Sequence, residues 1–239
     1  MILITMAGLS SRFFRAGYKL PKYMLCIQKE TVFSHAIRSF EKHFKTEKFL
    51  FVARDIFNTT EFIASECQKL GITEFEIVTL EQETRGQAET AYLALKDLSD
   101  QAVTIFNIDT FRYNYSHPYQ HDECDGYIEV FRGEGEHWSF VEPLANDLVL
   151  RTTEKVRISD LCSSGLYYFK SSKEFVKVFE TLESNNITTK GEFYIAPMYN
   201  YFIKNNKIIK YHCIAMDDID FCGTPAEYEH LLNAGMKNH

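Results

Sequence analysis

Four near-continuous apolar runs, separated by segments with helical spacing, are the feature that most constrains how this chain folds. They occupy residues 2–6, 49–53, 75–80 and 103–108. Apolar runs of this kind read as strands buried on both faces, and such strands alternating with helices form mostly parallel sheets. The sequence therefore predicts an α/β fold of the Rossmann-like, three-layer α/β/α type, with a mostly parallel central sheet.

The segments between these runs carry helix signals. Thr31 is suited to cap a helix whose apolar face repeats over residues 33–44, and Gly71 to close a helix over residues 63–70. Thr84 and Gln87 have the spacing of a capping box, and an apolar helix face follows them.

After about residue 110 the pattern changes to shorter strands separated by polar turns, at residues 126–131, 138–141, 148–152, 165–169 and 208–214. This half is predicted to be mixed and more antiparallel. A helix face covers residues 175–182, Pro197 starts another helix, and Thr224 and Glu227 form a capping box before the last one. No repeat or linker interrupts the chain, so a single domain over residues 1–239 is expected.

The charge balance restricts the partners. Among 239 residues, 26 Lys and Arg oppose 33 Asp and Glu, which gives a net charge of −7. Such a chain has no global positive field for nucleic acid or an anionic membrane, so an anionic ligand must be met by a local cluster of cations. The 14 Tyr and 20 Phe leave room for a homodimer surface.

The cysteines and the amino-terminal run bear on localisation. Six cysteines are scattered singly, and no pair has the C-x-x-C spacing. The apolar run at residues 1–6 is too short for a signal peptide core or a membrane span. A cytoplasmic protein with reduced thiols and no membrane insertion is expected.

The loop after the first apolar run has the composition of a phosphate cradle. It comprises Ala7, Gly8, Leu9, Ser10 and Ser11, followed by Arg12 and, ten residues later, Lys22. Small residues let backbone amides approach an anion, and the two cations supply the charge that a polyphosphate needs. The spacing matches neither common glycine-rich nucleotide motif, and a tight turn alone also accounts for it.

Asp109 follows the fourth apolar run. In an open parallel sheet, ligands bind outside the carboxyl ends of the strands, which puts this carboxylate at the same edge as the first loop. Such a carboxylate can hold Mg²⁺ between nucleotide phosphates, whereas the simpler alternative is a turn or helix cap.

These segments carry a family resemblance. Residues 7–13, Gly17-Tyr18 and Pro21-Lys22 resemble the amino-terminal signature of the sugar-phosphate nucleotidyltransferases, A-G-G-x-G-T-R with a later P-K. Further matches follow in the family's order and span nearly the whole chain: Gly86-Gln87-Ala88, Asp109, Glu154-Lys155, Ser164-Gly165-Leu166-Tyr167, Gly191-Glu192-Phe193-Tyr194 and Gly223-Thr224-Pro225. Trp138-Ser139-Phe140 and the G-E-F-Y-x-A-P run are similar to the capsule-biosynthesis nucleotidyltransferase-like subgroup.

The resemblance implies a GT-A-like fold, with a nucleotide-binding half over about residues 1–110 and an acceptor-binding half over about residues 111–239. It implies that Arg12, Lys22 and Asp109 act on the phosphates, that Gly86 and Gln87 read the base, and that Asp109 binds Mg²⁺. It further assigns Lys155 to the acceptor phosphate, Glu192 to acceptor hydroxyls, and Gly165 to the acceptor-binding strand.

Two departures from the family pattern stand out. Ser10 occupies a loop position where the family has glycine, which takes positive φ freely. Phe221 stands where many relatives have a late metal-binding aspartate. The neighbouring Asp220 is a weak match to the family position and is the candidate for that ligand.

Simpler explanations stand beside several of these assignments. The alternative for Lys22 and Lys155 is a solvated position on the surface. The alternative for Glu192 is to cap the helix that begins near Pro197, and for Gln87 it is to be only the capping-box partner of Thr84. Trp138 suits the core. His117, His121 and Cys124 lie close in sequence, but the second half of a zinc motif is missing.

The expected activity is transfer of a nucleoside monophosphate from a nucleoside triphosphate to a sugar or polyol phosphate, with release of pyrophosphate, for capsule or surface polysaccharide synthesis. One alternative is a glycosyltransferase that uses a nucleotide sugar, since the same fold with a metal carboxylate serves both. Another alternative is a regulatory protein that binds a nucleotide without turnover. The altered loop at Ser10 and the displaced aspartate are the reasons to consider it.

Overall fold

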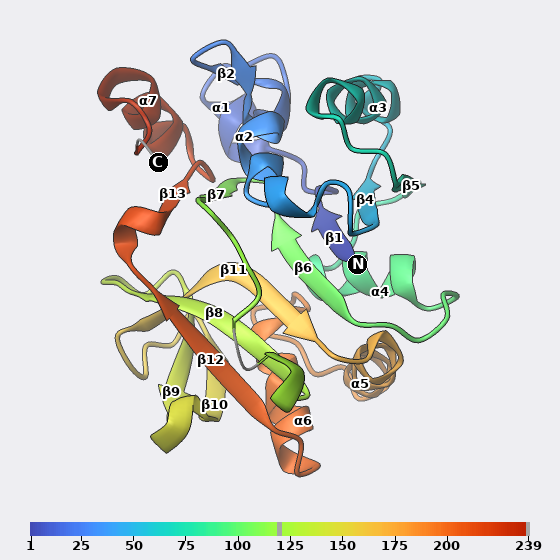
Figure 1. Cartoon of the computed structure of the whole chain (residues 1–239), viewed down its shortest axis with the longest axis vertical. Coiled ribbons are helices and arrows are strands. Elements are labelled where there is room, and N and C mark those ends of the chain that lie inside the picture. The colour runs from blue at the N-terminus through green and yellow to red at the C-terminus, as the bar shows by residue number, and fades with distance from the viewer. Residues whose placement is uncertain (119–120, 238–239) are drawn as a thin grey trace. The chain divides into compact units, whose positions relative to one another are not determined.

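The computed structural model describes residues 1–118 and 121–237, and the chain divides into two compact units, each made of three chain segments (Figure 1). Unit 1 comprises Met1–Leu3, Thr84–Phe106 and His117–Met216. Unit 2 comprises Ile4–Glu83, Asn107–Ser116 and Asp217–His239. The first strand, β1 (Ile2–Thr5), contributes residues to both units.

Unit 2 pairs its strands as predicted for the first half of the chain. Its main strands follow the order β1-β4-β5, and β4 and β5 are parallel. Its elements are α1 (Ser11–Arg15), β2 (Cys26–Ile27), β3 (Glu30–Thr31), α2 (Val32–Arg38), β4 (Phe49–Ala53), α3 (Thr59–Leu70), β5 (Phe75–Thr79), β7 (Thr110–Arg112), β13 (Ile219–Phe221) and α7 (Pro225–Ala234).

The caps of unit 2 explain where its helices begin and end. The Thr31 side chain accepts a hydrogen bond from the Ser34 amide at 3.0 Å, Gly71 closes α3 with a φ of 75°, and Thr224 and Glu227 form both bonds of a capping box. These three signals are confirmed. The first helix is shorter than its pattern, because α2 ends at Arg38 and a 3₁₀ turn over Glu41–His43 continues the segment.

Unit 1 holds the mixed half of the fold. Its strands follow the order β10-β9-β11-β6-β1, with β8 paired to β11 and to the parallel strand β12 (Figure 1). Its elements are α4 (Gln87–Leu95), β6 (Val103–Asn107), β8 (Gly126–Arg132), β9 (Ser139–Pro143), β10 (Val149–Glu154), β11 (Leu161–Phe169), α5 (Ser172–Ser184), α6 (Tyr199–Lys204) and β12 (Ile209–Ile214). The predicted α/β class, with a mixed second half, is confirmed.

One predicted helix start is wrong. The capping box at Thr84 and Gln87 does not form, because α4 begins at Gln87 and has Gly86 as its cap residue. The Thr84 hydroxyl instead lies 2.7 Å from the Thr90 hydroxyl, one turn into the helix.

Gly86 fixes this helix start against a second loop of unit 1. Its φ is 126°, and a Cβ there would lie 2.4 Å from the carbonyl oxygen of Phe193. The Phe193 amide donates to the Arg85 carbonyl at 2.6 Å, and the Ala88 amide donates to the Phe193 carbonyl at 3.0 Å. Only glycine allows this close approach of two backbones.

Replacing Gly86 by alanine should therefore destabilise the protein strongly. A methyl group clashes with the Phe193 backbone and the φ is strained, so we expect a loss of about 3 kcal/mol in the free energy of unfolding. Urea denaturation measures it. Gly8→Ala is the matched control: no atom lies within 4 Å of its Cβ position, and its loss should stay below about 0.5 kcal/mol. Equal losses for the two variants would contradict this account.

Candidate functional site

The loop that follows β1 is tied to Lys22 by the residue that departs from the family pattern. Ser10 adopts φ 52° and ψ 29°, the left-handed conformation, directly before α1. A serine in this region carries a steric cost that glycine avoids. Its hydroxyl accepts a hydrogen bond from the Lys22 amide at 3.1 Å, which offsets part of this cost. The loop therefore keeps the backbone conformation that glycine would favour and gains a link to Lys22.

The Lys22 ammonium forms an ion pair with the Asp109 carboxylate within unit 2. The two side chains are 19% and 23% exposed, so water screens the pair only partly while an incoming ligand can still reach it. Ser10, Lys22 and Asp109 thus meet in one place, although 87 residues separate the last two. A solvated surface role for Lys22 is therefore wrong.

Cys222 and Gly223 lie next to Asp109. The Cys222 amide donates to the Asp109 carbonyl at 2.8 Å, and a Cβ on Gly223 would lie 3.0 Å from Asp109 Oδ2. Burial, with the Asp109 carboxylate nearby, raises the pKa of Cys222 to about 12, so this thiol stays protonated. The lack of a side chain at Gly223 leaves space beside the carboxylate.

Asp220 has partners of its own in unit 2. Tyr113 donates its hydroxyl proton to Asp220 Oδ2 at 2.7 Å, and the Lys237 amide donates to the same oxygen at 3.1 Å. The Lys237 ammonium lies 3.5 Å from Asp220 Oδ1. Burial and the bond to Asp220 raise the pKa of Tyr113. A metal-binding role for Asp220 stays a prediction.

Arg12 is the second residue of α1, directly after the small-residue loop over residues 7–11, and its side chain is exposed. Within residues 1–118 and 121–237, its guanidinium forms no hydrogen bond or ion pair. Its charge is therefore available to an incoming anion. Its predicted action on phosphates stays a prediction.

In unit 1, the predicted base-contacting loop and the Gly191–Phe193 loop lie side by side. Gly86 packs on the Phe193 backbone, and Gln87 is the first residue of α4. Glu192 is exposed, and its amide and carbonyl both bond to Thr189. The short helix at Ala196–Met198 has Ile195 as its cap residue, so the alternative role of Glu192 as a helix cap is wrong.

Lys155 is held by a cluster in unit 1, and a freely solvated role for it is wrong. It follows β10 with φ 54°, and its amide donates to the Trp138 carbonyl at 2.9 Å. Its ammonium donates to the Tyr194 hydroxyl, lies 4.4 Å from the centre of the Tyr194 ring, and lies 3.8 Å from Glu154 Oε1. Burial alone would lower the pKa of Lys155, but Tyr194 and the carboxylates Glu154 and Glu192 raise it overall.

Glu154 is the buried acid of this cluster, with a side chain only 5% exposed. The Ser139 hydroxyl donates to it across the β9–β10 pair. Burial raises the pKa of Glu154, and the Glu192 carboxylate adds to this effect, while Ser139 and Lys155 oppose it. Burial and the charge of Glu154 likewise raise the pKa of Tyr167 to about 12.

Gly165 lies in the middle of β11 with φ 91°. The register of β11 against β8 shifts between Ser163 and Tyr167, and the Gly165 amide bonds to the Ser163 hydroxyl at 3.1 Å. A strand irregularity with glycine at positive φ bends the strand locally. This explains why glycine stands at this position.

The sequence assignment missed two residues of the Lys155 cluster, Ser139 and Tyr194. Both lie inside motifs that the sequence shows, Trp138-Ser139-Phe140 and Gly191-Glu192-Phe193-Tyr194. Motif spacing alone could not show that their hydroxyls reach Glu154 and Lys155.

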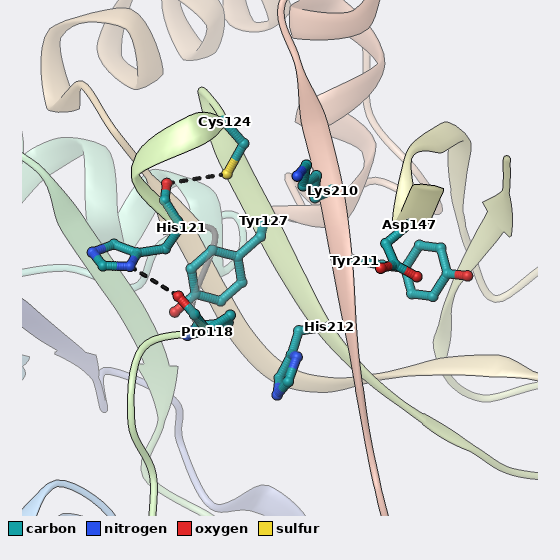
Figure 2. Close-up of a pocket in the computed structure, with 8 residues that line it drawn as sticks. All are labelled: Pro118, His121, Cys124, Tyr127, Asp147, Lys210, Tyr211 and His212. Carbon is teal, nitrogen blue, oxygen red and sulfur yellow. Dashed lines mark hydrogen bonds between the residues drawn. The ribbon is translucent and has the colours of Figure 1, made fainter. Parts of the chain in front are cut away.

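A separate cavity of about 260 Å³ in unit 1 involves none of the assigned residues (Figure 2). It is lined by Pro118, His121, Cys124, Tyr127, Asp147, Lys210, Tyr211 and His212. His121 Nδ1 lies 2.9 Å from the Pro118 carbonyl, and the Cys124 thiol donates to the His121 carbonyl at 3.3 Å. Backbone carbonyls thus engage the histidine and cysteine that resemble half of a zinc motif.

Two further observations concern the cysteines and the helices. All six cysteines are free thiols. Among the described residues, no helix has both the length and the apolar character needed to cross a membrane.

Solved structures resemble the chain over nearly its full length. A nucleoside-diphosphate-sugar pyrophosphorylase from Vibrio cholerae RC9 is 43% identical, with a TM-score of 0.94 over 97% of this chain and 99% of that one. A putative glucose-1-phosphate thymidylyltransferase from Bacillus anthracis (16% identity, TM-score 0.79, 100% and 96% covered) and an inositol-1-phosphate CTP transferase from T. maritima (14%, 0.75, 99% and 96%) share the fold. No family model and no curated protein matches the chain.

The buried Glu154 predicts a pH-dependent stability difference. A carboxyl group whose pKa is raised on folding stabilises the protein fully below the unfolded pKa, here 4.5, and this contribution is lost as the pH rises through the folded value. Gln at this position does not titrate. Relative to wild type, Glu154→Gln should therefore gain free energy of unfolding as the pH rises from 4.5 through the raised pKa of Glu154.

Urea denaturation at several pH values measures this difference. Glu136→Gln is the matched control, because the Glu136 side chain in the same unit is exposed. This control measures the effect of removing a carboxylate from an exposed position of the same unit. A difference between Glu154→Gln and wild type that changes with pH no more than the control's difference would contradict the raised pKa.

Proposed function

Since this chain belongs to the nucleotidyltransferase family of the nucleoside-diphosphate-sugar pyrophosphorylases, we propose that it transfers a nucleoside monophosphate from a nucleoside triphosphate to a sugar or polyol phosphate and releases pyrophosphate. The observation that carries this proposal is the Lys22–Asp109 ion pair beside the Ser10 loop. This pair supports the proposal because it joins, within one unit, the lysine and the aspartate that the family resemblance assigns to the phosphates.

The chemistry makes specific demands on these residues. A phosphate oxygen of the acceptor attacks the α-phosphorus in line, the bond to the bridging oxygen breaks, and pyrophosphate leaves with the electron pair. Two unit charges of the same sign 4 Å apart repel by about 4 kcal/mol at an effective dielectric near 20, so each anion needs its own cation. Lys22 and the unpaired Arg12 serve the triphosphate, and Lys155 serves the acceptor phosphate.

Asp109 fits a magnesium site. Its carboxylate is partly exposed, and the missing side chain at Gly223 leaves space beside Oδ2. Carboxylate and phosphate oxygens are the ligands that Mg²⁺ takes in such sites. When bound, the ion would neutralise charge on the phosphates. Asp109 would hold it, with Asp220 as the candidate second ligand if Tyr113 and Lys237 release it.

The remaining assignments concern selectivity and context. Gly86 and Gln87 would contact the base, while Glu192 would accept hydrogen bonds from acceptor hydroxyls. A cytoplasmic role in capsule or surface polysaccharide synthesis rests on the G-E-F-Y-x-A-P and W-S-F resemblance. The replacement of glycine by Ser10 was one argument for a regulatory protein without turnover. That argument is weakened, because Ser10 adopts the left-handed conformation despite its side chain.

A substrate panel tests the proposal. CTP, GTP, UTP and dTTP are each combined with glucose 1-phosphate, inositol 1-phosphate and other sugar or polyol phosphates, with Mg²⁺ present, and pyrophosphate is measured. Release that depends on both substrates supports the proposal. Free nucleoside diphosphate from a nucleotide sugar would favour a glycosyltransferase instead.

With the nucleotide and acceptor that release pyrophosphate in this panel, Lys22→Ala should lower kcat by at least about 100-fold, because the substitution removes a positive charge that would stabilise the leaving pyrophosphate. Lys19→Ala is the matched control: Lys19 is exposed and three residues away in the same loop. Its kcat should stay within about twofold of wild type. A Lys22→Ala enzyme with wild-type kcat would sink the assignment.

A further inference from the structure

Tyr194 contacts the lysine that the proposed function assigns to the acceptor phosphate. Its hydroxyl oxygen accepts a hydrogen bond from the Lys155 ammonium. Burial and the Glu192 carboxylate raise the pKa of Tyr194, while Lys155 opposes this effect. All three residues lie in unit 1. One phenol group therefore contacts the cation expected at the acceptor phosphate, and it follows two residues after the acid expected at the acceptor hydroxyls.

The contact constrains Lys155 in two ways. The ammonium lies 4.4 Å from the centre of the Tyr194 ring, so a cation–π attraction adds to the hydrogen bond. A lysine side chain has many rotamers, and immobilising it costs conformational entropy when a ligand binds. Because the Tyr194 contacts already restrict the Lys155 side chain, less conformational entropy is lost when a ligand binds.

Without Tyr194, the nearest described anion for this ammonium is the buried Glu154. Its carboxylate lies 3.8 Å from Lys155 Nζ and is itself bonded by Ser139. A lysine drawn fully to Glu154 would have its charge neutralised by a buried acid and would be less available to a phosphate. The Tyr194 hydroxyl keeps the ammonium between the ring and Glu154.

We propose that Tyr194 is the positioning residue of the acceptor site, which holds the Lys155 ammonium ready for the acceptor phosphate. This inference rests on the proposed function and extends it to a residue with no assigned role. Tyr194 makes no bond to the reacting phosphorus and acts through Lys155.

The role predicts a split between kinetic constants. Lys155 contacts the acceptor phosphate before and during the reaction, so its position affects ground state and transition state alike, and KM for the acceptor changes while kcat does not. Tyr194→Phe removes the hydroxyl but keeps the ring. Because a hydrogen bond to a charged group is lost, we expect KM for the acceptor to rise about tenfold, with kcat and KM for the nucleotide unchanged.

Tyr201→Phe is the matched control. Tyr201 lies in α6 of the same unit, is half-buried, and also has a lysine over its ring, since Lys204 Nζ lies 5.3 Å from the ring centre. No acceptor residue contacts it among the described contacts. This variant should keep the KM for the acceptor within about twofold of wild type.

A second background separates positioning from a purely structural effect. In Lys155→Ala the ammonium is gone, so adding Tyr194→Phe should raise KM for the acceptor no further, whereas loss of structure would act in both backgrounds. The unchanged kcat and nucleotide KM of Tyr194→Phe show that the protein is folded.

The outcomes are distinguishable. If the wild-type enzyme releases pyrophosphate with glucose 1-phosphate or inositol 1-phosphate, and Tyr194→Phe raises acceptor KM only when Lys155 is present, the inference stands. An unchanged acceptor KM, an effect on kcat alone, or an equal effect without Lys155 overturns it while leaving the proposed function intact. A wild-type protein that turns over no substrate pair overturns both.

Discussion

The Lys22–Asp109 ion pair is the interaction on which the phosphate site depends. Lysine and aspartate come from distant parts of the sequence, and the pairing of β7 with β13 and the bond from Cys222 to the Asp109 carbonyl hold the acid in place. Ser10 holds the lysine by its amide. The pair is partly exposed, so each partner can exchange the other for a ligand of opposite charge.

A backbone contact has the same importance for the acceptor half. Gly86 lies directly against the Phe193 backbone, and two backbone hydrogen bonds join the start of α4 to the Gly191–Phe193 loop. That loop leads into Tyr194, which holds Lys155. The residue predicted to read the base and the residues predicted to hold the acceptor are thereby fixed to each other within unit 1.

Sequence patterns predicted the elements whose signal is local. The four apolar runs located β1, β4, β5 and β6. Thr31, Gly71 and the Thr224 capping box marked helix ends, since each depends on neighbours within a few residues. The short strands β7 and β13 were not predicted, because they carry too few residues for a pattern. Thr84 failed as a cap because Gly86 meets Phe193, a contact across 107 residues that no local signal encodes.

The candidate site divides in the same way. Family motifs pointed to Lys22, Asp109 and Lys155, and the structure places the first two in contact. The bonds of Ser10, Ser139 and Tyr194 depend on side-chain directions that only the folded chain defines. The substitution of glycine by Ser10, which reads as a defect in the motif, supplies one of these bonds.

The most direct test of the central claim measures divalent metal binding together with nucleotide. Mn²⁺ replaces Mg²⁺ as a paramagnetic probe, and electron paramagnetic resonance counts the bound ion in the presence of each of the four nucleoside triphosphates. If Asp109 and Lys22 share the nucleotide phosphates, Asp109→Asn should weaken binding of the Mn²⁺–nucleotide complex by about tenfold or more, whereas Asp122→Asn, at an exposed acid, should leave it unchanged. Equal binding by wild type and Asp109→Asn would contradict the account.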